Sequence, residues 1–204
     1  MLQIKNLSVK VGEKQILNQI SFDFETGKNY CILGKNGSGK SSLAMTLAGN
    51  PKYEISEGEL LLDGHSLKEM SPDERNRAGI FLTFQNIPEV PGVKLFEFLK
   101  TIYDARAEKP STFLEFKKII EPLMAELEIE KAFLWRDLNV GFSGGEKRKI
   151  EVLQIKLLKP KYIILDEIDS GLDVNAVRQV AELLKAVNTQ ENSFIVIPHL
   201  FEML

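Results

Sequence analysis

The chain has 204 residues, of which 44% are hydrophobic and 27% are charged, and its formal net charge at pH 7 is −3, which is typical of a globular protein with one well-buried core. The sequence has no basic stripe for nucleic acid, no run of about 20 apolar residues for a membrane span, and only one cysteine, Cys31, so it has no partner for an intramolecular disulfide. We therefore expect a single domain over residues 1–204, located in the cytoplasm, that neither binds nucleic acid nor inserts into a membrane.

Strands and helices are expected to alternate along the first part of the chain. A turn at Gly12 separates two strands with alternating apolar residues, and Gly49 ends the first helix. Ser71 followed by Pro72 is typical of the start of a second, short helix. The expected strands are residues 2–11, 16–24, 29–34, 58–64 and 79–85, with those at 29–34 and 79–85 buried, and the expected helices are residues 41–49 and 71–79.

After Gln85 the pattern becomes mainly helical. The expected helices are residues 93–105 and 112–129, the second interrupted at Pro122, followed by a helix at 144–158, a strand at 161–167, a helix at 173–188 and a strand at 192–198. Strands that alternate with helices indicate a parallel sheet covered on both faces, with ligands at the carboxyl ends of the strands.

Residues 32–42, ILGKNGSGKSS, match the phosphate-binding pattern G-x-x-x-x-G-K-[ST]. Glycines at positions 34, 37 and 39 let backbone N–H groups surround a phosphate chain, Lys40 reaches the β- and γ-phosphates, and the Ser41 hydroxyl can ligate Mg²⁺. A flexible loop can match this pattern by chance, but the strand expected before it and the helix expected after it favour a nucleotide site. The nucleotide contacts expected from the pattern are Gly34, Gly37, Gly39, Lys40 and Ser41.

An acidic pair ends the apolar strand YIILDE. Asp166 is expected to hold the metal, directly or through water, and Glu167 to orient or deprotonate a water beside the γ-phosphate. Two carboxylates that end a strand in solvent are the ordinary alternative, and the phosphate loop upstream favours the catalytic interpretation.

A second anion site is suggested by NVGFSGGEKRK, residues 139–149. Ser143 before two glycines and a run of helix formers is typical of a helix N-terminus that holds an anion. Ser143 and Glu146 also match an ordinary capping box. A capping box does not require Gly144 and Gly145, which weaken a helix and are useful where the backbone approaches a ligand closely.

Three weaker signals complete an ordered set of motifs: Gln85 at a strand end, DSGLD at residues 169–173, and His199 after the last strand. Separately they are explained as a polar strand end, a helix N-cap at Asp173 and a surface histidine. In the order phosphate loop, Gln85, SGGE, ILDE, SGLD, His199, they resemble the nucleotide-binding domain of ABC ATPases over nearly the whole chain. Within that superfamily, segments such as EVPGV and LNVGFSGGEKRK resemble the SufC family, the ATPases of the SUF iron–sulfur cluster assembly system.

The resemblance implies an α/β P-loop NTPase fold: a mostly parallel sheet flanked by helices, an N-terminal antiparallel β portion and a helical insert. Residues 1–85 and 141–204 would form the nucleotide-binding core, and residues 86–140 the helical subdomain. The implied cofactors are ATP and Mg²⁺. The implied partners are SufB-like and SufD-like scaffold proteins and a second copy of the chain, which would form a homodimer when ATP is bound.

The resemblance also implies roles for matching residues. Gln85 would contact the metal and the γ-phosphate and assist catalysis by Glu167, and His199 would contact the γ-phosphate of its own ATP. Ser143, Gly144 and Gly145 would contact the ATP held by the other copy. Further nucleotide contacts implied in the phosphate loop are Asn36, Ser38 and Ser42, and the metal contacts are Ser41, Gln85 and Asp166.

The sequence departs from the family pattern at three places. Val11 stands where many ABC ATPases have an aromatic residue that stacks on adenine, so part of the base affinity is expected to be missing. Pro198 replaces the usual Thr or Ser before His199 and removes a backbone donor at the strand end. Family members continue for a few dozen residues past the histidine, so we interpret a sequence that ends at Leu204 as truncated, incomplete or a shortened variant.

Two other functions stay open on the sequence alone. The chain could be the ATPase subunit of an ABC membrane transporter, which uses the same motif chemistry. It could also be a nucleotide-gated binding module with little turnover, although Glu167 argues against this because a sensor needs no base beside the γ-phosphate. The segments SPDERNRAG and EVPGV favour the SufC family by resemblance. The segment QNIPEVPGV, residues 85–93, is the expected docking surface for a scaffold protein.

Overall fold

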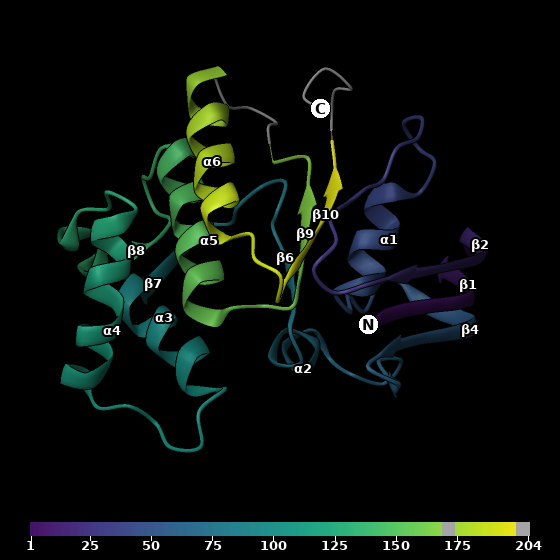
Figure 1. The fold of residues 1–204 in the computed structure, drawn as a ribbon, viewed down its shortest axis with the longest axis horizontal. Coiled ribbons are helices and arrows are strands. Elements are labelled where there is room, and N and C mark those ends of the chain that lie inside the picture. The colour runs from purple at the N-terminus through teal and green to yellow at the C-terminus, as the bar shows by residue number, and fades with distance from the viewer. Residues whose placement is uncertain (169–173, 199–204) are drawn as a thin grey trace. The chain divides into compact units, whose positions relative to one another are not determined.

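The structure is a computed structural model that describes residues 1–168 and 174–198 (Figure 1). The chain forms two compact units: unit 1 comprises Met1–Gln85, Pro160–Ile168 and the described part of Asn188–Leu204, and unit 2 comprises Asn86–Lys159 and the described part of Asp169–Val187. Unit 2 begins where the helical subdomain was expected to begin, but it also includes the helices at 144–158 and 174–187. The functional division into a core and a helical subdomain stays a prediction.

An antiparallel sheet opens unit 1. It consists of β1 (Leu2–Val11), β2 (Lys14–Phe24), β4 (Glu54–Leu62) and β5 (His65–Ser66), in the order β2-β1-β4-β5. Apolar side chains of β1 are buried against the rest of the unit, among them Leu2, Ile4 and Val9. The predicted N-terminal antiparallel portion is therefore confirmed.

The second sheet of unit 1 is parallel. It consists of β3 (Tyr30–Cys31), β6 (Ile80–Leu82), β9 (Tyr162–Asp166) and β10 (Ser193–Ile197), in the order β3-β10-β9-β6. Helix α1 (Lys40–Leu47) contacts strands of both sheets (Figure 1). Its residues Leu43, Ala44 and Leu47 are buried in the core that the two sheets share. This arrangement places the phosphate loop and the end of β9 at the carboxyl edge of the parallel strands.

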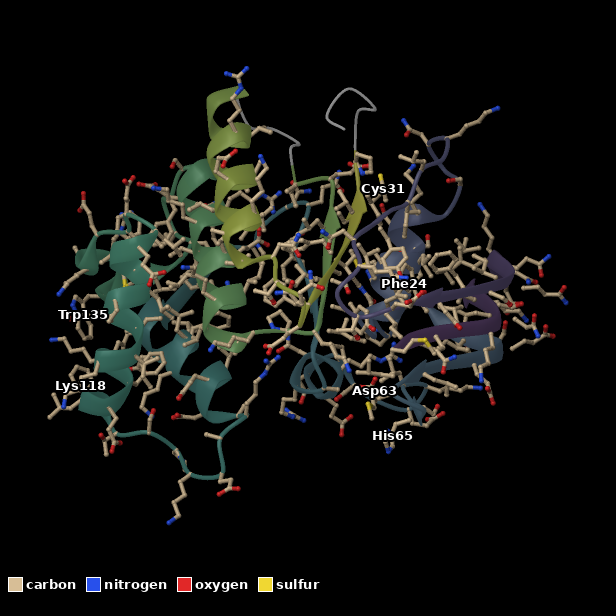
Figure 2. All side chains as sticks on the ribbon, viewed as in Figure 1. Phe24, Cys31, Asp63, His65, Lys118 and Trp135 are labelled. Carbon is tan, nitrogen blue, oxygen red and sulfur yellow. The ribbon has the colours of Figure 1, made fainter. Side chains whose placement is uncertain are left out.

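The strand before the phosphate loop is shorter and more exposed than predicted. Of the segment 29–34, two residues form β3, Cys31 is exposed (Figure 2), and the side chain of Leu33 is 50% exposed. β3 lies at the sheet edge and pairs with β10 alone, so fewer neighbours cover it. The prediction of a buried strand was therefore wrong for this segment.

Two buried polar side chains hold unit 1 together. Arg75, from the short helix α2 (Pro72–Arg77), donates through its Nη1 atom to the carbonyl oxygens of Thr46 (2.6 Å) and Leu47 (3.3 Å), where α1 ends. The Tyr162 hydroxyl donates to the Phe24 carbonyl (2.9 Å) and accepts from the Leu2 N–H (3.0 Å), which joins β9 to the antiparallel sheet. These bonds fix the end of α1 and the start of β9, the two elements that carry Ser41 and Asp166.

Unit 2 is mainly helical. Helix α5 (Gly144–Leu158) contacts α3 (Leu95–Asp104), α4 (Phe113–Glu126) and α6 (Val174–Val187), and the 3₁₀ helix η1 (Lys131–Trp135) contacts α3. Strands β7 (Val90–Lys94) and β8 (Asp137–Leu138) form an antiparallel pair that the sequence pattern did not predict.

The predicted break at Pro122 was wrong, because α4 continues through this residue. Pro122 lies on an exposed face of the helix, where water can hydrogen-bond the carbonyl group that the missing N–H leaves without a donor.

Candidate nucleotide-binding site

The phosphate loop between β3 and α1 requires glycine at defined positions. Gly37 (φ 80°) and Gly39 (φ 95°) have left-handed backbone conformations, and Gly39 is the N-cap of α1. A Cβ atom at Gly39 would lie 2.7 Å from Cδ2 of Leu17, and one at Gly34 would lie 2.7 Å from Oγ of Ser38. A side chain at Gly34 or Gly39 would require Ser38 or Leu17 to shift, whereas Gly37 and Gly39 are favoured by their left-handed φ values.

Lys40 is held against this loop by two carbonyl groups. Its Nζ atom donates to the carbonyl oxygens of Gly34 (2.9 Å) and Lys35 (3.3 Å). The loop borders a cavity of about 320 Å³, lined by residues 32–36, Lys40 and Pro198. A volume of this size lies at the lower end of small-molecule sites, and the Lys40 ammonium group supplies a positive charge for a phosphate group there.

Ser41 and Asp166 meet across the sheet edge. The Ser41 hydroxyl donates to Oδ1 of Asp166 (3.1 Å), and the backbone N–H of Asp166 donates to Oγ1 of Thr83 (3.4 Å). Burial raises the pKa of the Asp166 carboxyl, and the charge of Glu167 adds to this, whereas the bond from Ser41 and the charge of Lys40 oppose it. A neighbouring cation would favour the ionised carboxylate.

The donor set of this site fits Mg²⁺. Mg²⁺ prefers oxygen ligands and usually takes one or two carboxylates together with phosphate oxygens and water. The hydroxyl of Ser41 and the carboxylate of Asp166 are such ligands. Among the described residues there is no cluster of three or more His, Cys, Asp and Glu side chains, so an all-protein cage for another metal is not present in that part of the chain.

Glu167 is paired with Gln85 in this structure. Nε2 of Gln85 donates to Oε2 of Glu167 at 2.6 Å, and the backbone N–H of Glu167 donates to the Ile197 carbonyl at 2.9 Å. Glu167 has a φ of 48°, which is uncommon for a residue with a side chain and is found more often at functional sites. Unit 1 therefore brings together Lys40, Ser41, Gln85, Asp166 and Glu167.

The segment at Ser143 belongs to unit 2 and has the geometry of a capping box. The N–H of Glu146 donates to Oγ of Ser143 (3.3 Å), and the N–H of Ser143 donates to Oε2 of Glu146 (2.7 Å), which lowers the pKa of Glu146. A Cβ atom at Gly145 would meet nothing within 4 Å, so packing among the described residues does not explain a glycine there. A cavity of about 280 Å³ lies beside it, lined by residues 128–130, Phe133, Ser143, Gly145, Glu146 and Lys149.

Two predicted features lie outside the described residues: His199 and the segment DSGLD at 169–173. One supporting residue was missed. Thr83 is 3% exposed, and its hydroxyl donates to the Ile164 carbonyl (3.3 Å) while it accepts from the N–H of Asp166. A polar residue inside the apolar run GIFLTFQ is the signal that could have identified it.

Comparison with known proteins identifies the family. The family model for ABC transporters matches residues 17–170. A probable ATP-dependent transporter, ycf16, from Antithamnion sp. is 43% identical over 100% of this chain and 83% of its own length. The probable ATP-dependent transporter SufC from Escherichia coli (strain K12) is 41% identical over 98% of this chain and 82% of its own length. The chain therefore belongs to the ABC transporter family, and it is an ABC-type ATPase that binds and hydrolyses ATP.

Solved structures confirm the fold. The dimeric post-hydrolysis structure of the ATP-binding cassette MJ0796 bound to ADP and phosphate superposes with a TM-score of 0.80, at 22% sequence identity, over 98% of this chain and 88% of the other. At this identity the likeness concerns the α/β cassette fold alone. None of the helices in the described part of the chain is long and apolar enough to cross a bilayer.

The buried carboxyl of Asp166 predicts a stability that depends on pH. Because the pKa of Asp166 is raised in the folded state, the fold favours the neutral carboxyl. The stability that the neutral carboxyl contributes is lost as the pH rises through the folded pKa. Without nucleotide or Mg²⁺, Asp166→Asn should therefore raise the free energy of unfolding at pH 7, with a smaller gain towards about pH 4, near the ordinary pKa of aspartate. Urea unfolding in EDTA at both pH values measures this difference.

Asp73→Asn is the matched control. Bonds from Ser71 and Arg77 lower the pKa of Asp73, so this substitution should lower stability at pH 7 instead. A loss of stability at pH 7 in Asp166→Asn that shrinks towards pH 4 would contradict the interpretation of Asp166.

Proposed function

We propose that this ATPase drives rearrangements of SufB-like and SufD-like scaffold proteins during iron–sulfur cluster assembly, and that it works as a dimer that closes on ATP and Mg²⁺. The meeting of Lys40, Ser41, Gln85, Asp166 and Glu167 at one edge of a sheet supports the hydrolytic part of the proposal. The similarity to SufC over nearly the whole chain supports the assignment to iron–sulfur assembly in the cytoplasm.

Each residue has a role that follows from its contacts. The Lys40 ammonium group would exchange the carbonyls of Gly34 and Lys35 for β- and γ-phosphate oxygens. Ser41 and Asp166 would hold Mg²⁺, which neutralises charge on the phosphates when it is bound. Glu167 would accept a proton from the attacking water, and the amide of Gln85 would orient its carboxylate.

Substitutions of Lys40 and Glu167 should have different effects. Lys40→Ala removes the cation that meets the phosphates and should abolish tight ATP binding. Glu167→Gln keeps an acceptor for the Gln85 amide but removes the base, so binding should persist while hydrolysis slows by roughly 10²- to 10⁴-fold. Fluorescent-nucleotide binding and phosphate release measure the two effects.

Lys35→Ala is the control for Lys40→Ala. Lys35 is in the same loop and contacts Lys40 through its backbone carbonyl, which the substitution retains, so ATP binding should change little. Equal losses of binding in Lys40→Ala and Glu167→Gln would remove the role assigned to Glu167.

The proposed anion site at Ser143–Gly145, which we call the anion cradle, predicts recovery of activity in mixed dimers. In a head-to-tail dimer, Ser143 would contact the ATP bound at Lys40 of the other copy, and two-fold symmetry makes this reciprocal. Lys40→Ala and Ser143→Arg should each be inactive alone. In their mixed dimer, one site carries both substitutions and the other carries none. Random pairing makes about half of the dimers mixed, and each mixed dimer has one of two sites intact, so roughly a quarter of wild-type activity should return.

If Ser143 acted on ATP in its own chain, every site would keep a lesion and mixing would restore nothing. Light scattering with ATP and Mg²⁺ is the control for coupling between sites, because strong coupling could silence a single intact site in a dimer that still forms. No recovery together with a monomer at saturating ATP would leave the segment as a capping box only.

The segment at residues 85–93, which ends within β7, is the proposed scaffold-docking surface. Pro88 and Glu89 are exposed, Val90 is half-buried, and Val93 is 38% exposed. Replacing Pro88, Val90 or Val93 with glutamate should weaken scaffold binding and leave ATP binding unchanged. Leu114→Glu is the matched control, because Leu114 is an apolar residue of the same unit that is 67% exposed.

Purified SufB-like and SufD-like proteins serve as the probes in this assay. An unchanged scaffold affinity in all three variants of the segment 85–93 would place the interface elsewhere. Recovery of membrane proteins in place of soluble scaffolds from native cells would favour the transporter alternative, and negligible phosphate release with and without partners would favour the binding module.

A further inference from the structure

Two side-chain contacts fasten the loop after Gln85 to the segment around Ser143. Nδ2 of Asn139 donates to the Pro88 carbonyl at 2.9 Å, and Nζ of Lys147 donates to Oε1 of Glu89 at 2.8 Å. Both contacts lie within unit 2, and they join residues that are 51 and 58 positions apart in the sequence. The attachments flank Ser143, four residues before it and four residues after it.

Asn139 begins the turn that leads to Ser143. It is 4% exposed, has a left-handed φ of 61°, and its carbonyl accepts from the N–H of Phe142 (3.3 Å). Its Oδ1 atom is buried without a hydrogen-bond partner among the described residues. A half-satisfied buried amide is costly, and glycine would tolerate the same φ without that cost. The bond to Pro88 is the contact that asparagine provides and glycine would not.

Lys147 lies in the first turn of α5. Residues four apart share one face of a helix, so Lys147 follows Ser143 along the same face. Its side chain is 19% exposed, and that of Glu89 is 48% exposed. An exposed ion pair alone contributes little, but this pair acts together with the buried Asn139 contact on the other side of Ser143. A displacement of Pro88 and Glu89 therefore acts on both ends of the Ser143 segment.

We propose that Asn139 and Lys147 are positioning residues that transmit movements of the loop at residues 86–89 to the anion cradle at Ser143–Gly145. This inference rests on the proposed role of Ser143 towards the ATP of a second copy. Docking of a partner on the loop would then adjust the cradle directly, without acting through the phosphate loop of unit 1. Loss of either attachment should lower the rate of hydrolysis without weakening the binding of ATP at Lys40.

A charge exchange tests the Lys147 attachment. Lys147→Glu and Glu89→Lys should each lower kcat of the full chain by about threefold or more, with the Kd for a fluorescent ATP analogue unchanged. The double variant restores an opposite-charge pair and should recover at least half of the wild-type kcat. Unchanged kcat in both single variants, or no recovery in the double variant, would overturn the role of Lys147.

Lys156→Glu is the matched control. Lys156 is in the same helix, its side chain is also 19% exposed, and it pairs with Glu126 of α4 and not with the loop. Its substitution should leave kcat unchanged. A similar fall in kcat for Lys156→Glu would mean that any lost ion pair of α5 has this effect, and it would overturn the specific role of the loop attachment.

Two substitutions test Asn139. Asn139→Gly keeps the left-handed backbone but removes the attachment, and Asn139→Asp keeps the shape but loses the donor to Pro88. Both substitutions should lower kcat and leave the nucleotide Kd unchanged. A purely structural role would change kcat and Kd together. Wild-type kcat in folded Asn139→Gly would overturn its role.

The mixed-dimer assay and the kcat values of the attachment variants test the dimer and the attachments separately. Recovery on mixing Lys40→Ala with Ser143→Arg, together with wild-type kcat in the attachment variants, would overturn the attachments alone. Absence of recovery with a monomeric protein would overturn the role of Ser143 towards a second copy and, with it, the proposed purpose of the attachments.

Discussion

The hydrogen bond from Ser41 to Asp166 is the contact around which the candidate nucleotide site is arranged. It joins residues 125 positions apart in the sequence, one at the start of α1 and one at the end of β9. The parallel sheet makes this meeting feasible, because strand ends that point the same way deliver their following residues to one edge. Lys40 and Glu167 adjoin these two residues in the sequence, and Gln85 follows the end of β6 in the same sheet.

Two residues at this edge lower the stability of the fold. Burial raises the pKa of Asp166, and Glu167 has a left-handed backbone, so the fold without nucleotide holds both residues at a cost. Contacts elsewhere in unit 1 offset it. Arg75 satisfies carbonyl groups at the end of α1, and Tyr162 ties the start of β9 to β1 and β2.

Local signals predicted the parts of the fold that short-range physics decides. The helix at 144–158 was placed from its own capping residue, and the phosphate loop from the spacing of its glycines and Lys40. Features that depend on distant neighbours were missed. The exposure of β3 follows from its place at a sheet edge, the tolerance of Pro122 from the face of α4 that it occupies, and the β7–β8 pair from a long-range pairing of short strands. The pairing of Gln85 with Glu167 also could not be read from either motif alone.

The segment from Gln85 to Glu89 makes contacts with both candidate anion sites, at Glu167 and around Ser143. Within unit 1, Gln85 donates to Glu167, the proposed base. Within unit 2, the next contacts along the chain are those of Pro88 with Asn139 and of Glu89 with Lys147. Only residues 86 and 87 separate the first contact from the second. Because a peptide segment this short has little slack, the contact of Gln85 and the contacts of Pro88 and Glu89 constrain the same short stretch of chain.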